Sequence, residues 1–280
     1  AGAVLEVGRG GRLDAVNALD ADAALVVSIG LAHTDWLGPD RNSIGYEKAG
    51  IYRLGRPAIC ADPDPPQRLL DTAKQIGANL QRVGRDYTFT RTGSTWRWES
   101  EQVRFDGLPP PALVGAHQIG NAAAVLMTLI SLRQQLPISF SAICAGFAQV
   151  QLPGRFQIIP GEVEWILDVA HNPPAAAILA DNLRTRPCSG RTLAVFGLLA
   201  DKDADGVIQA LADSVDEWYT AALPGLRGRT DAELTDLLIA SDNRAWAAGD
   251  AVNACRAARQ AAQPGDRIVI LGSFHVVAPA

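Results

Sequence analysis

The composition of this chain favours a globular protein and argues against a nucleic-acid partner. Its 280 residues are 48% hydrophobic, which is enough to bury one large core or two ordinary ones. The net charge is -5 with only 25 lysines and arginines, so no broad basic field is available for a polyanion. No apolar run approaches the roughly 20 uninterrupted residues of a membrane span, and we therefore expect no membrane partner.

The four cysteines indicate a reducing environment. Cys60, Cys144, Cys188 and Cys255 are scattered, without a C-x-x-C pair or the spacing of a zinc site. Disulfide frameworks belong to oxidising compartments, so we expect these residues to be buried thiols of a cytoplasmic protein.

The sequence at both ends of the chain is typical of secondary structure in the middle of a fold. Met127 is the only methionine, and residues 4–7 are typical of a buried strand that is entered partway through a fold. At the other end, residues 272–278 stop where a strand passes into a helix. These features predict a fragment of a longer protein.

The alternation of apolar runs with amphipathic segments predicts an α/β fold. Residues 4–7 and 23–30 are apolar runs ended by glycine, as in buried parallel strands with functional loops at their carboxyl ends. The other elements expected up to residue 150 are a helix at 43–51, a strand at 57–60, a helix at 65–76, an antiparallel hairpin system at 87–106, and helices at 118–132 and 139–150.

A second domain is expected after residue 150. Pro153 and Gly154 interrupt the chain between a helix and a new series of strands, which is typical of a domain boundary. We therefore predict domains at 1–150 and 151–280, the second with Rossmann-like layers. Its expected strands are 163–169, 192–196, 217–222 and 267–271, and its expected helices are 173–183, 204–214, 231–239 and 251–261.

Three residues of the first domain are candidates for metal binding. Glu6 ends a predicted strand, His33 follows the next one, and Lys48 lies within a predicted helix. A carboxylate at a strand end can face a cation, and an imidazole can join it. Each residue also has a plainer interpretation: Glu6 can form an ion pair, His33 can cap its neighbouring segment, and Lys48 can pair with a glutamate in solvent. The residue types alone leave both interpretations open.

In the second domain, polar residues gather where strands are expected to end. Asp168 and His171 follow one predicted strand, and Ser273 and His275 follow another. Ligands of α/β proteins bind at this edge of the sheet. Capping of the next helix is an equally simple explanation for Asp168.

Asn121 and Arg155 are candidates for contact with a nucleotide. Asn121 lies in the opening turns of an apolar helix, where it can also serve as a helix-start hydrogen bonder. Arg155 can tie the linker to an acidic surface, but its planar fork also suits bidentate binding of phosphate. We interpret both as ATP contacts.

Six short motifs together resemble one known family. They are L-E-V-G-R-G-G-R-L-D-A at 5–15, G-L-A-H-T-D-W-L-G at 30–38, Y-E-K-A-G-I at 46–51, L-P-G-R-F-Q at 152–157, D-V-A-H-N-P at 168–173 and G-S-F-H at 272–275. With them the chain resembles, nearly end to end, the bacterial bifunctional dihydrofolate synthases/folylpolyglutamate synthases of the Mur ligase superfamily. The resemblance implies that residues 1–150 are the C-terminal part of a P-loop-type central domain, and that residues 151–280 are a Rossmann-like glutamate ligase domain.

The resemblance also implies roles for individual residues. The implied magnesium ligands are Glu6, His33 and Lys48, with Lys48 carbamylated to provide oxygen donors. The implied ATP contacts are Asn121, Arg155 and Asp168. The implied substrate contacts are Leu13, Asp14 and Ala15 for the pterin-bearing substrate, and Ser273 and His275 for glutamate. Lys48 and His171 are the implied catalytic residues, with His171 near the γ-phosphate and the incoming glutamate.

The implied activity is that of an ATP-dependent carbon–nitrogen ligase. Such an enzyme adds L-glutamate to dihydropteroate or to a reduced folate through an acyl phosphate, with ATP as a substrate and Mg²⁺ as the cofactor, and we expect a monomer. The motif G-x-x-x-x-G-K-S/T is absent from the sequence, and the family places it upstream of Ala1. We therefore expect this chain to be inactive alone. The alternatives are another Mur-type amino-acid ligase acting on a cell-wall nucleotide precursor, and a non-catalytic nucleotide- or folate-binding remnant.

Overall fold

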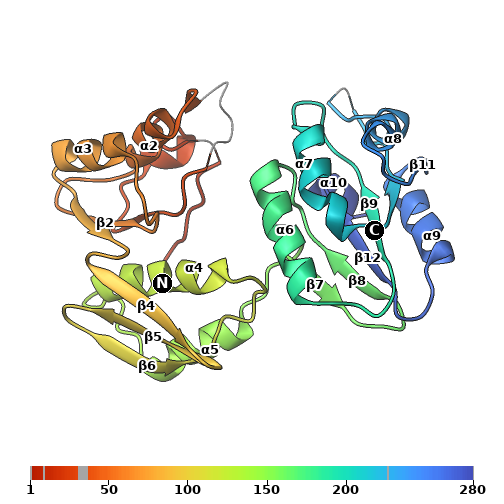
Figure 1. Ribbon diagram of the computed structural model, residues 1–280. Helices are drawn as coiled ribbons and strands as arrows, with labels where there is room; N and C mark the ends of the chain where they lie inside the picture. The colour runs from red at the N-terminus through yellow and green to blue at the C-terminus, as the bar shows by residue number, and fades with distance from the viewer. Residues whose placement is uncertain (1, 9, 31–36, 226, 280) are drawn as a thin grey trace. The chain divides into compact units, whose positions relative to one another are not determined.

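The computed structural model of the protein describes residues 2–8, 10–30, 37–225 and 227–279 (Figure 1). The chain divides into two compact units, Ala1–Ala112 with Ala116–Val150, and Leu113–Gly115 with Gln151–Ala280. Apart from residues 113–115, the division falls next to Val150. Within the described ranges, no helix is both long and apolar enough to cross a membrane.

A small parallel sheet forms one half of the first unit. Its described strands run in the order β1 (Ala24–Val26), β2 (Pro57–Cys60) and β3 (Asn79–Arg82). Helices α2 (Arg41–Ala49) and α3 (Gln67–Ile76) lie between these strands in the sequence and share one apolar core with them. The crossovers through these helices bring the carboxyl ends of β1 and β2 to the same edge of the sheet.

An antiparallel sheet and two helices form the other half of this unit. The strands are β4 (Tyr87–Thr92), β5 (Thr95–Ser100) and β6 (Arg104–Leu108), and the helices are α4 (His117–Ser131) and α5 (Phe140–Gln149). Trp96 and Trp98 alternate with polar residues in β5, so both rings lie in the core. The Trp98 indole donates a hydrogen bond to the carbonyl oxygen of Ala123 in α4 at 3.1 Å. The hairpin system expected at 87–106 is confirmed.

The second unit is a mixed sheet with helices on both faces (Figure 1). The described strands run in the order β11 (Ala245–Ala247), β10 (Glu217–Thr220), β9 (Thr192–Phe196), β12 (Arg267–Leu271), β8 (Glu164–Leu167) and β7 (Gln157–Ile159), and β7 alone among them runs antiparallel to its neighbour. Helices α6 (Pro173–Thr185), α7 (Ala204–Leu211) and α8 (Asp231–Ala240) share a core with one face, and α9 (Ala251–Ala261) and α10 (Phe274–Val277) with the other. Because β12 lies between β9 and β8, the loops that follow these three strands leave the sheet side by side.

The apolar segment 4–7 is not a strand, and this expectation from the sequence was wrong. Val4 and Leu5 are exposed, and no described residue pairs with their backbone. β1 likewise covers only three residues of the apolar run 23–30. A strand needs hydrogen bonds from a neighbour, and within the described residues β1 has a partner on its β2 side only.

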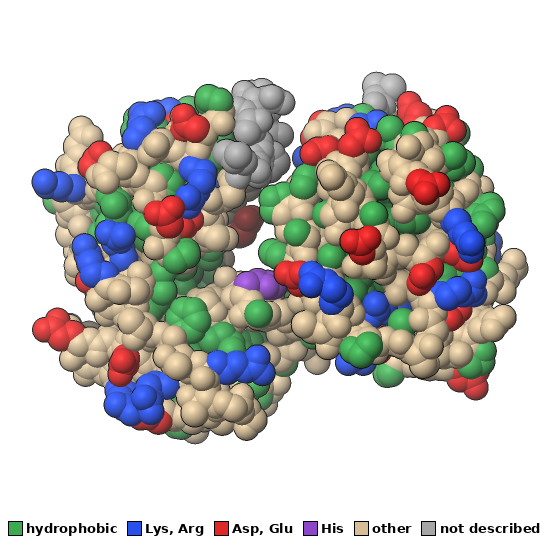
Figure 2. Space-filling model, in the orientation of Figure 1, with side chains coloured by type: hydrophobic (Ala, Val, Ile, Leu, Met, Phe, Trp, Pro, Cys, Tyr) green, Lys and Arg blue, Asp and Glu red, His purple; other side chains and the backbone are tan. Residues whose placement is uncertain are grey.

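Basic and acidic side chains are interspersed on the face of the molecule shown in Figure 2. Several charges of the chain are engaged in ion pairs, such as Arg104 with Asp106 at 2.8 Å and Arg56 with Asp22 at 3.4 Å. An anionic ligand must therefore be held by individual cations and backbone donors at a local site, because the charges of this face form no single field.

Candidate functional site

Helix α2 carries Lys48 into a half-buried position. The helix begins after Asp40, whose carboxylate accepts a hydrogen bond from the Ser43 amide at 2.8 Å. Ile44 and Ala49 are buried on the apolar side of this helix. Lys48 precedes Ala49 in the last turn, so its side chain starts beside the core and is only partly open to solvent.

The surroundings of Lys48 favour its neutral form. Burial lowers the pKa of the Lys48 ammonium, and the negative charge of Glu6 opposes this shift in part. Glu47 does not compensate the lysine, because its carboxylate pairs with Arg12 at 3.0 Å. The structure thus differs from the plainer interpretation of a solvated lysine paired with its neighbouring glutamate.

The donors near Lys48 fit a hard divalent cation only in part. The exposed carboxylate of Glu6 is close enough to Lys48 to influence its pKa, and carboxylate oxygens are preferred by Mg²⁺. An amine is a poor ligand for this ion, whereas a lysine carbamate would present oxygen. His33 lies outside the described residues, and those described contain no cluster of three or more His, Cys, Asp or Glu side chains.

Residues 13–15 form a turn next to Arg12, whose backbone is hydrogen-bonded to the end of α2. Asp14 caps the short 3-10 helix η1 (Ala15–Ala18). The amide of the neighbouring Arg12 donates to the carbonyl oxygen of Glu47 at 2.9 Å. Leu13 is 79% exposed, so its side chain can cover an apolar part of a ligand without leaving a core.

The carboxylate of Asp168 holds the turn at Phe156 in the second unit by hydrogen bonds. One of its carboxylate oxygens accepts from the Phe156 amide and the other from the Ala170 amide, both at 2.8 Å. Phe156 is buried with a φ of 46°, a left-handed conformation that is unusual for a residue with a bulky side chain. Asp168 therefore holds the turn at Phe156 against the end of β8.

His171 lies on the same loop, at the carboxyl edge of the sheet. Its Nδ1 atom lies 2.9 Å from the carbonyl oxygen of Val169. A carbonyl oxygen only accepts hydrogen bonds, so Nδ1 carries the hydrogen and Nε2 is the acceptor of the neutral ring. Asn172 then caps α6 by accepting from the Ala175 amide at 3.0 Å. The histidine is thus oriented between a strand end and a helix start.

Ser273 lies on the neighbouring loop, after β12. β8 and β12 pair with Leu167 opposite Ile270, so their loops leave the sheet together. The Ser273 oxygen accepts from the His275 amide at 3.1 Å, and the hydroxyl hydrogen can still be donated to an anionic group. The side chain of His275 is exposed.

Two of the three predicted ATP contacts, Asn121 and Arg155, belong to different units, and both are exposed. Asn121 lies in α4, and its amide nitrogen donates to the Gln118 side chain at 3.1 Å. The Arg155 side chain projects from the turn that Asp168 holds. Asp168, His171 and Ser273 therefore lie on loops at the same sheet edge, and His275 lies in α10, which follows one of these loops. Asn121 belongs to the first unit.

Arg229 is a further cation near the sheet edge, and the sequence did not indicate it as a site residue. One guanidinium nitrogen lies 3.4 Å from the carbonyl oxygens of Ala200 and Lys202, in the loop that follows β9. Its Nε is buried and has no acceptor among the described residues. Lys202 pairs with Asp201 at 2.9 Å in this loop. The arginine precedes a helix cap at Thr230, and this local signal explains its position without suggesting a ligand.

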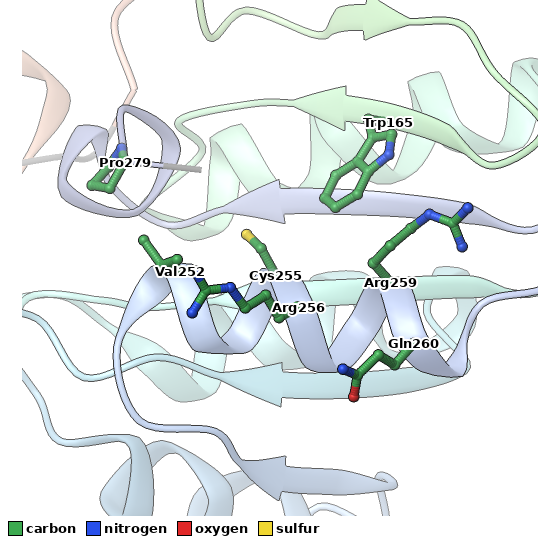
Figure 3. A pocket seen from close by; sticks show the side chains of 7 residues that line it. All are labelled: Trp165, Val252, Cys255, Arg256, Arg259, Gln260 and Pro279. Carbon is green, nitrogen blue, oxygen red and sulfur yellow. The ribbon is translucent and has the colours of Figure 1, made fainter.

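A separate cavity of about 350 Å³ lies between β8 and α9 (Figure 3). Trp165 from β8 and Cys255 from α9 both line it, together with Arg256 and Arg259 of the same helix. Burial raises the pKa of the Cys255 thiol to about 11, so this cysteine is neutral at physiological pH and is a weak nucleophile. None of the site residues proposed from the sequence lines this cavity. We therefore treat it as separate from the site at the sheet edge, which is formed by Asp168, His171 and Ser273.

The fold and the sheet-edge site define the class of protein. Residues 154–274 match the family described as "Mur ligase, glutamate ligase domain". They include the turn at Gly154, the Asp168 loop and Ser273, so the class is that of the Mur ligases.

Individual relatives narrow the class to one family. The dihydrofolate synthase/folylpolyglutamate synthase of Escherichia coli is 43% identical over 275 residues, and the alignment covers 98% of this chain and 63% of the relative. The protein with the same description from Haemophilus influenzae is 36% identical, with 98% and 66% covered. The chain belongs to the dihydrofolate synthase/folylpolyglutamate synthase family of the Mur ligase superfamily.

Solved structures agree with this assignment. The structure of E. coli FolC in complex with DHPP and ADP superposes with a TM-score of 0.90 at 44% identity, covering 98% of this chain and 64% of that one. A bifunctional folylpolyglutamate synthase/dihydrofolate synthase with Mn, AMPPNP and L-glutamate bound superposes with a TM-score of 0.87 at 42% identity, with the same coverage. The chain thus spans about two thirds of the length of its relatives.

Proposed function

We propose that the full-length protein is an ATP-dependent amide ligase that adds L-glutamate to dihydropteroate and to reduced folates. One observation carries this proposal: the residues matched to a glutamate ligase domain bring Asp168, His171 and Ser273 to one sheet edge. The relatives described above carry both synthase names, and their structures hold ADP, AMPPNP, L-glutamate and DHPP. These ligands support ATP and glutamate as substrates.

Amide formation needs an activated acyl group, because a carboxylate is a poor electrophile. We propose that the acceptor's carboxylate takes the γ-phosphoryl group of ATP, which yields an acyl phosphate and ADP. The amino group of glutamate then attacks the acyl carbon, an amide bond forms, and phosphate leaves with the oxygen that came from the carboxylate.

The residues of the chain have separate parts in this reaction. Magnesium, held by Glu6, His33 and a carbamylated Lys48, would offset the negative charge of the phosphoryl group being transferred. A solved relative contains Mn with AMPPNP, which supports a divalent metal at this step. The exposed turn at residues 13–15 would lie against the pterin-bearing substrate.

We assign the nucleotide to the exposed Asn121 and Arg155, with Asp168 holding the Arg155 turn and contacting ATP. A guanidinium group suits phosphate oxygens because it donates two parallel hydrogen bonds. His171 presents Nε2 at the sheet edge and can exchange a proton with the incoming amine. The Ser273 hydroxyl and the exposed His275 can donate to the carboxylates of glutamate.

The test is a ligation assay of the purified full-length protein with labelled glutamate, ATP and Mg²⁺. Dihydropteroate and tetrahydrofolate are supplied in separate reactions. We expect ATP-dependent incorporation of glutamate with both acceptors. Incorporation with a cell-wall nucleotide precursor, but with neither pterin compound, would favour the other Mur-type ligase activity and refute the folate assignment.

A further inference from the structure

A buried carboxylate joins the segment that follows β1 to the start of α2. Asp62 follows β2 and is 3% exposed. One of its oxygens accepts from the Ile29 amide at 2.7 Å, and both lie 3.1 Å from a guanidinium nitrogen of Arg41. Arg41 also donates to the Ile29 carbonyl oxygen at 3.0 Å. The Asp62–Arg41 pair therefore holds both backbone groups of Ile29.

This pair lies where α2 has no apolar anchor. Ile44 and Ala49 fix the later turns of the helix in the core, whereas Asn42 in its first turn is exposed. Arg41 is the first residue of the helix. The guanidinium group contacts Ile29, Asp62 and the carbonyl oxygen of Asp64, the last at 2.8 Å. It therefore links α2 to the segments that follow β1 and β2.

We propose that Arg41 and Asp62 are positioning residues, which hold helix α2, and with it Lys48, in register with the carboxyl end of β1. This inference rests on the proposed function, because Lys48 is assigned there to the divalent metal. Lys48 follows Arg41 by two turns of the same helix, so a tilt of the first turn moves the side chain that must reach the metal. A carboxylate that orients a ligand-bearing element in this way tunes metal affinity without touching the ion.

Asp64 supplies a matched control for the pair. Its carboxylate lies 3.2 Å from Arg41, but its side chain is 92% exposed, and no hydrogen bond links that side chain to Ile29. A solvated contact of this kind contributes little. Asp64→Asn therefore removes a charge beside the same arginine while leaving the β1–α2 link in place.

The test is a titration of Mn²⁺ into the full-length protein with AMPPNP, followed by electron paramagnetic resonance. We expect Asp62→Asn and Arg41→Lys to weaken Mn²⁺ binding by about tenfold or more, because neither replacement can make the forked contact. Asp64→Asn should stay within about twofold of the wild type. The fraction folded is measured for each variant by thermal unfolding, and affinities are compared for the folded protein only.

Two results would overturn the inference, and they are distinguishable. Wild-type affinity in folded Asp62→Asn would show that packing alone positions α2, with the proposed function untouched. An absence of Mn²⁺ binding by the wild type would remove the metal site itself, and the positioning role with it.

Discussion

Lys48 is the residue on which the proposed metal site depends most. Its side chain is half-buried, its pKa is lowered by that burial, and the adjacent Glu47 is already paired with Arg12. A folded-state pKa below the ordinary 10.5 means that the ammonium destabilises the fold most at pH values below the folded-state pKa, and that this cost is gone once the pH exceeds 10.5. The neutral amine is the form that reacts with carbon dioxide, so the chemistry of this site is tied to pH.

We expect Lys48 to form a carbamate at a lower pH than an exposed lysine. The measurement is carbon-13 NMR of the full-length protein in labelled bicarbonate with Mg²⁺, in which a carbamate signal should grow with rising pH. Lys48→Arg should remove the signal. Lys74→Arg, at an exposed position on α3, should leave it unchanged. A signal that survives Lys48→Arg would show that this lysine is not the modified residue.

Asp168 should matter for stability as well as for ATP. Replacement by alanine removes two hydrogen bonds to a charged acceptor and leaves the Phe156 turn without its partner. We expect Asp168→Ala to lower the free energy of unfolding of the second unit by about 3 kcal/mol. Urea denaturation measures this change. Asp181→Ala, at an exposed position on α6, is the control and should change little. Equal stability of the two variants would contradict the structural role.

Ser273 tests where glutamate binds. Loss of one donor to a bound carboxylate costs about 1–3 kcal/mol of that ligand's affinity, so Ser273→Ala should raise the KM for glutamate by about tenfold or more. The KM for ATP should change much less. Ser241→Ala removes an exposed hydroxyl at the end of α8 and should leave both values unchanged. If Ser273→Ala weakens ATP or the folate acceptor instead, this edge does not hold the amino acid.

At the scale of elements, most apolar runs predicted a strand, apart from residues 4–7, and three short strands were missed. β2 and β9 have the bounds expected from the sequence, and the helix expected at 251–261 is α9. β3, β7 and β11 have three or four residues each and were not expected, because so short a segment shows no clear period. Their pairing is set by the neighbouring strand, which a local pattern does not reveal.

Some features of the candidate site were also predictable from the sequence, and others were not. The motifs at 168–173 and 272–275 predicted polar residues at strand ends, and the structure places them on neighbouring loops of one sheet edge. The carboxylate contacts of Asp168, the pairing of Asp62 with Arg41 and the buried Nε of Arg229 were not predictable. Each depends on residues far apart in the sequence that only the tertiary fold brings together.

The close approach of β9 and β12 gives a prediction at this scale. Gly272 has a φ of 107°, and a β-carbon there would lie 2.2 Å from the carbonyl oxygen of Gly197. Gly225 also has a positive φ, of 88°, but open space around it. Gly225→Ala should therefore cost only the backbone strain, about 1–3 kcal/mol, whereas Gly272→Ala should cost clearly more because two loops must separate. Thermal unfolding measures the stability of both variants. Equal losses of stability would show that the loops after β9 and β12 can separate at little cost.

At the scale of the whole molecule, the two units carry different parts of the proposed reaction. The first contains Lys48 and the exposed turn at 13–15, and the second contains the region matched to a glutamate ligase domain. The relatives extend over more residues than this chain, which contains no G-x-x-x-x-G-K-S/T motif. The activity is therefore proposed for the full-length protein.

We propose that the full-length protein activates a carboxylate by phosphorylation and joins it to glutamate. The most direct measurement uses dihydropteroate labelled with oxygen-18 in its carboxylate, with ATP, Mg²⁺ and glutamate, and analyses the released phosphate by mass spectrometry. We expect one labelled oxygen in the phosphate for each amide formed, because the phosphate leaves with a carboxylate oxygen when the acyl carbon is attacked. Amide formation with unlabelled phosphate, or ATP hydrolysis without amide formation, would contradict it.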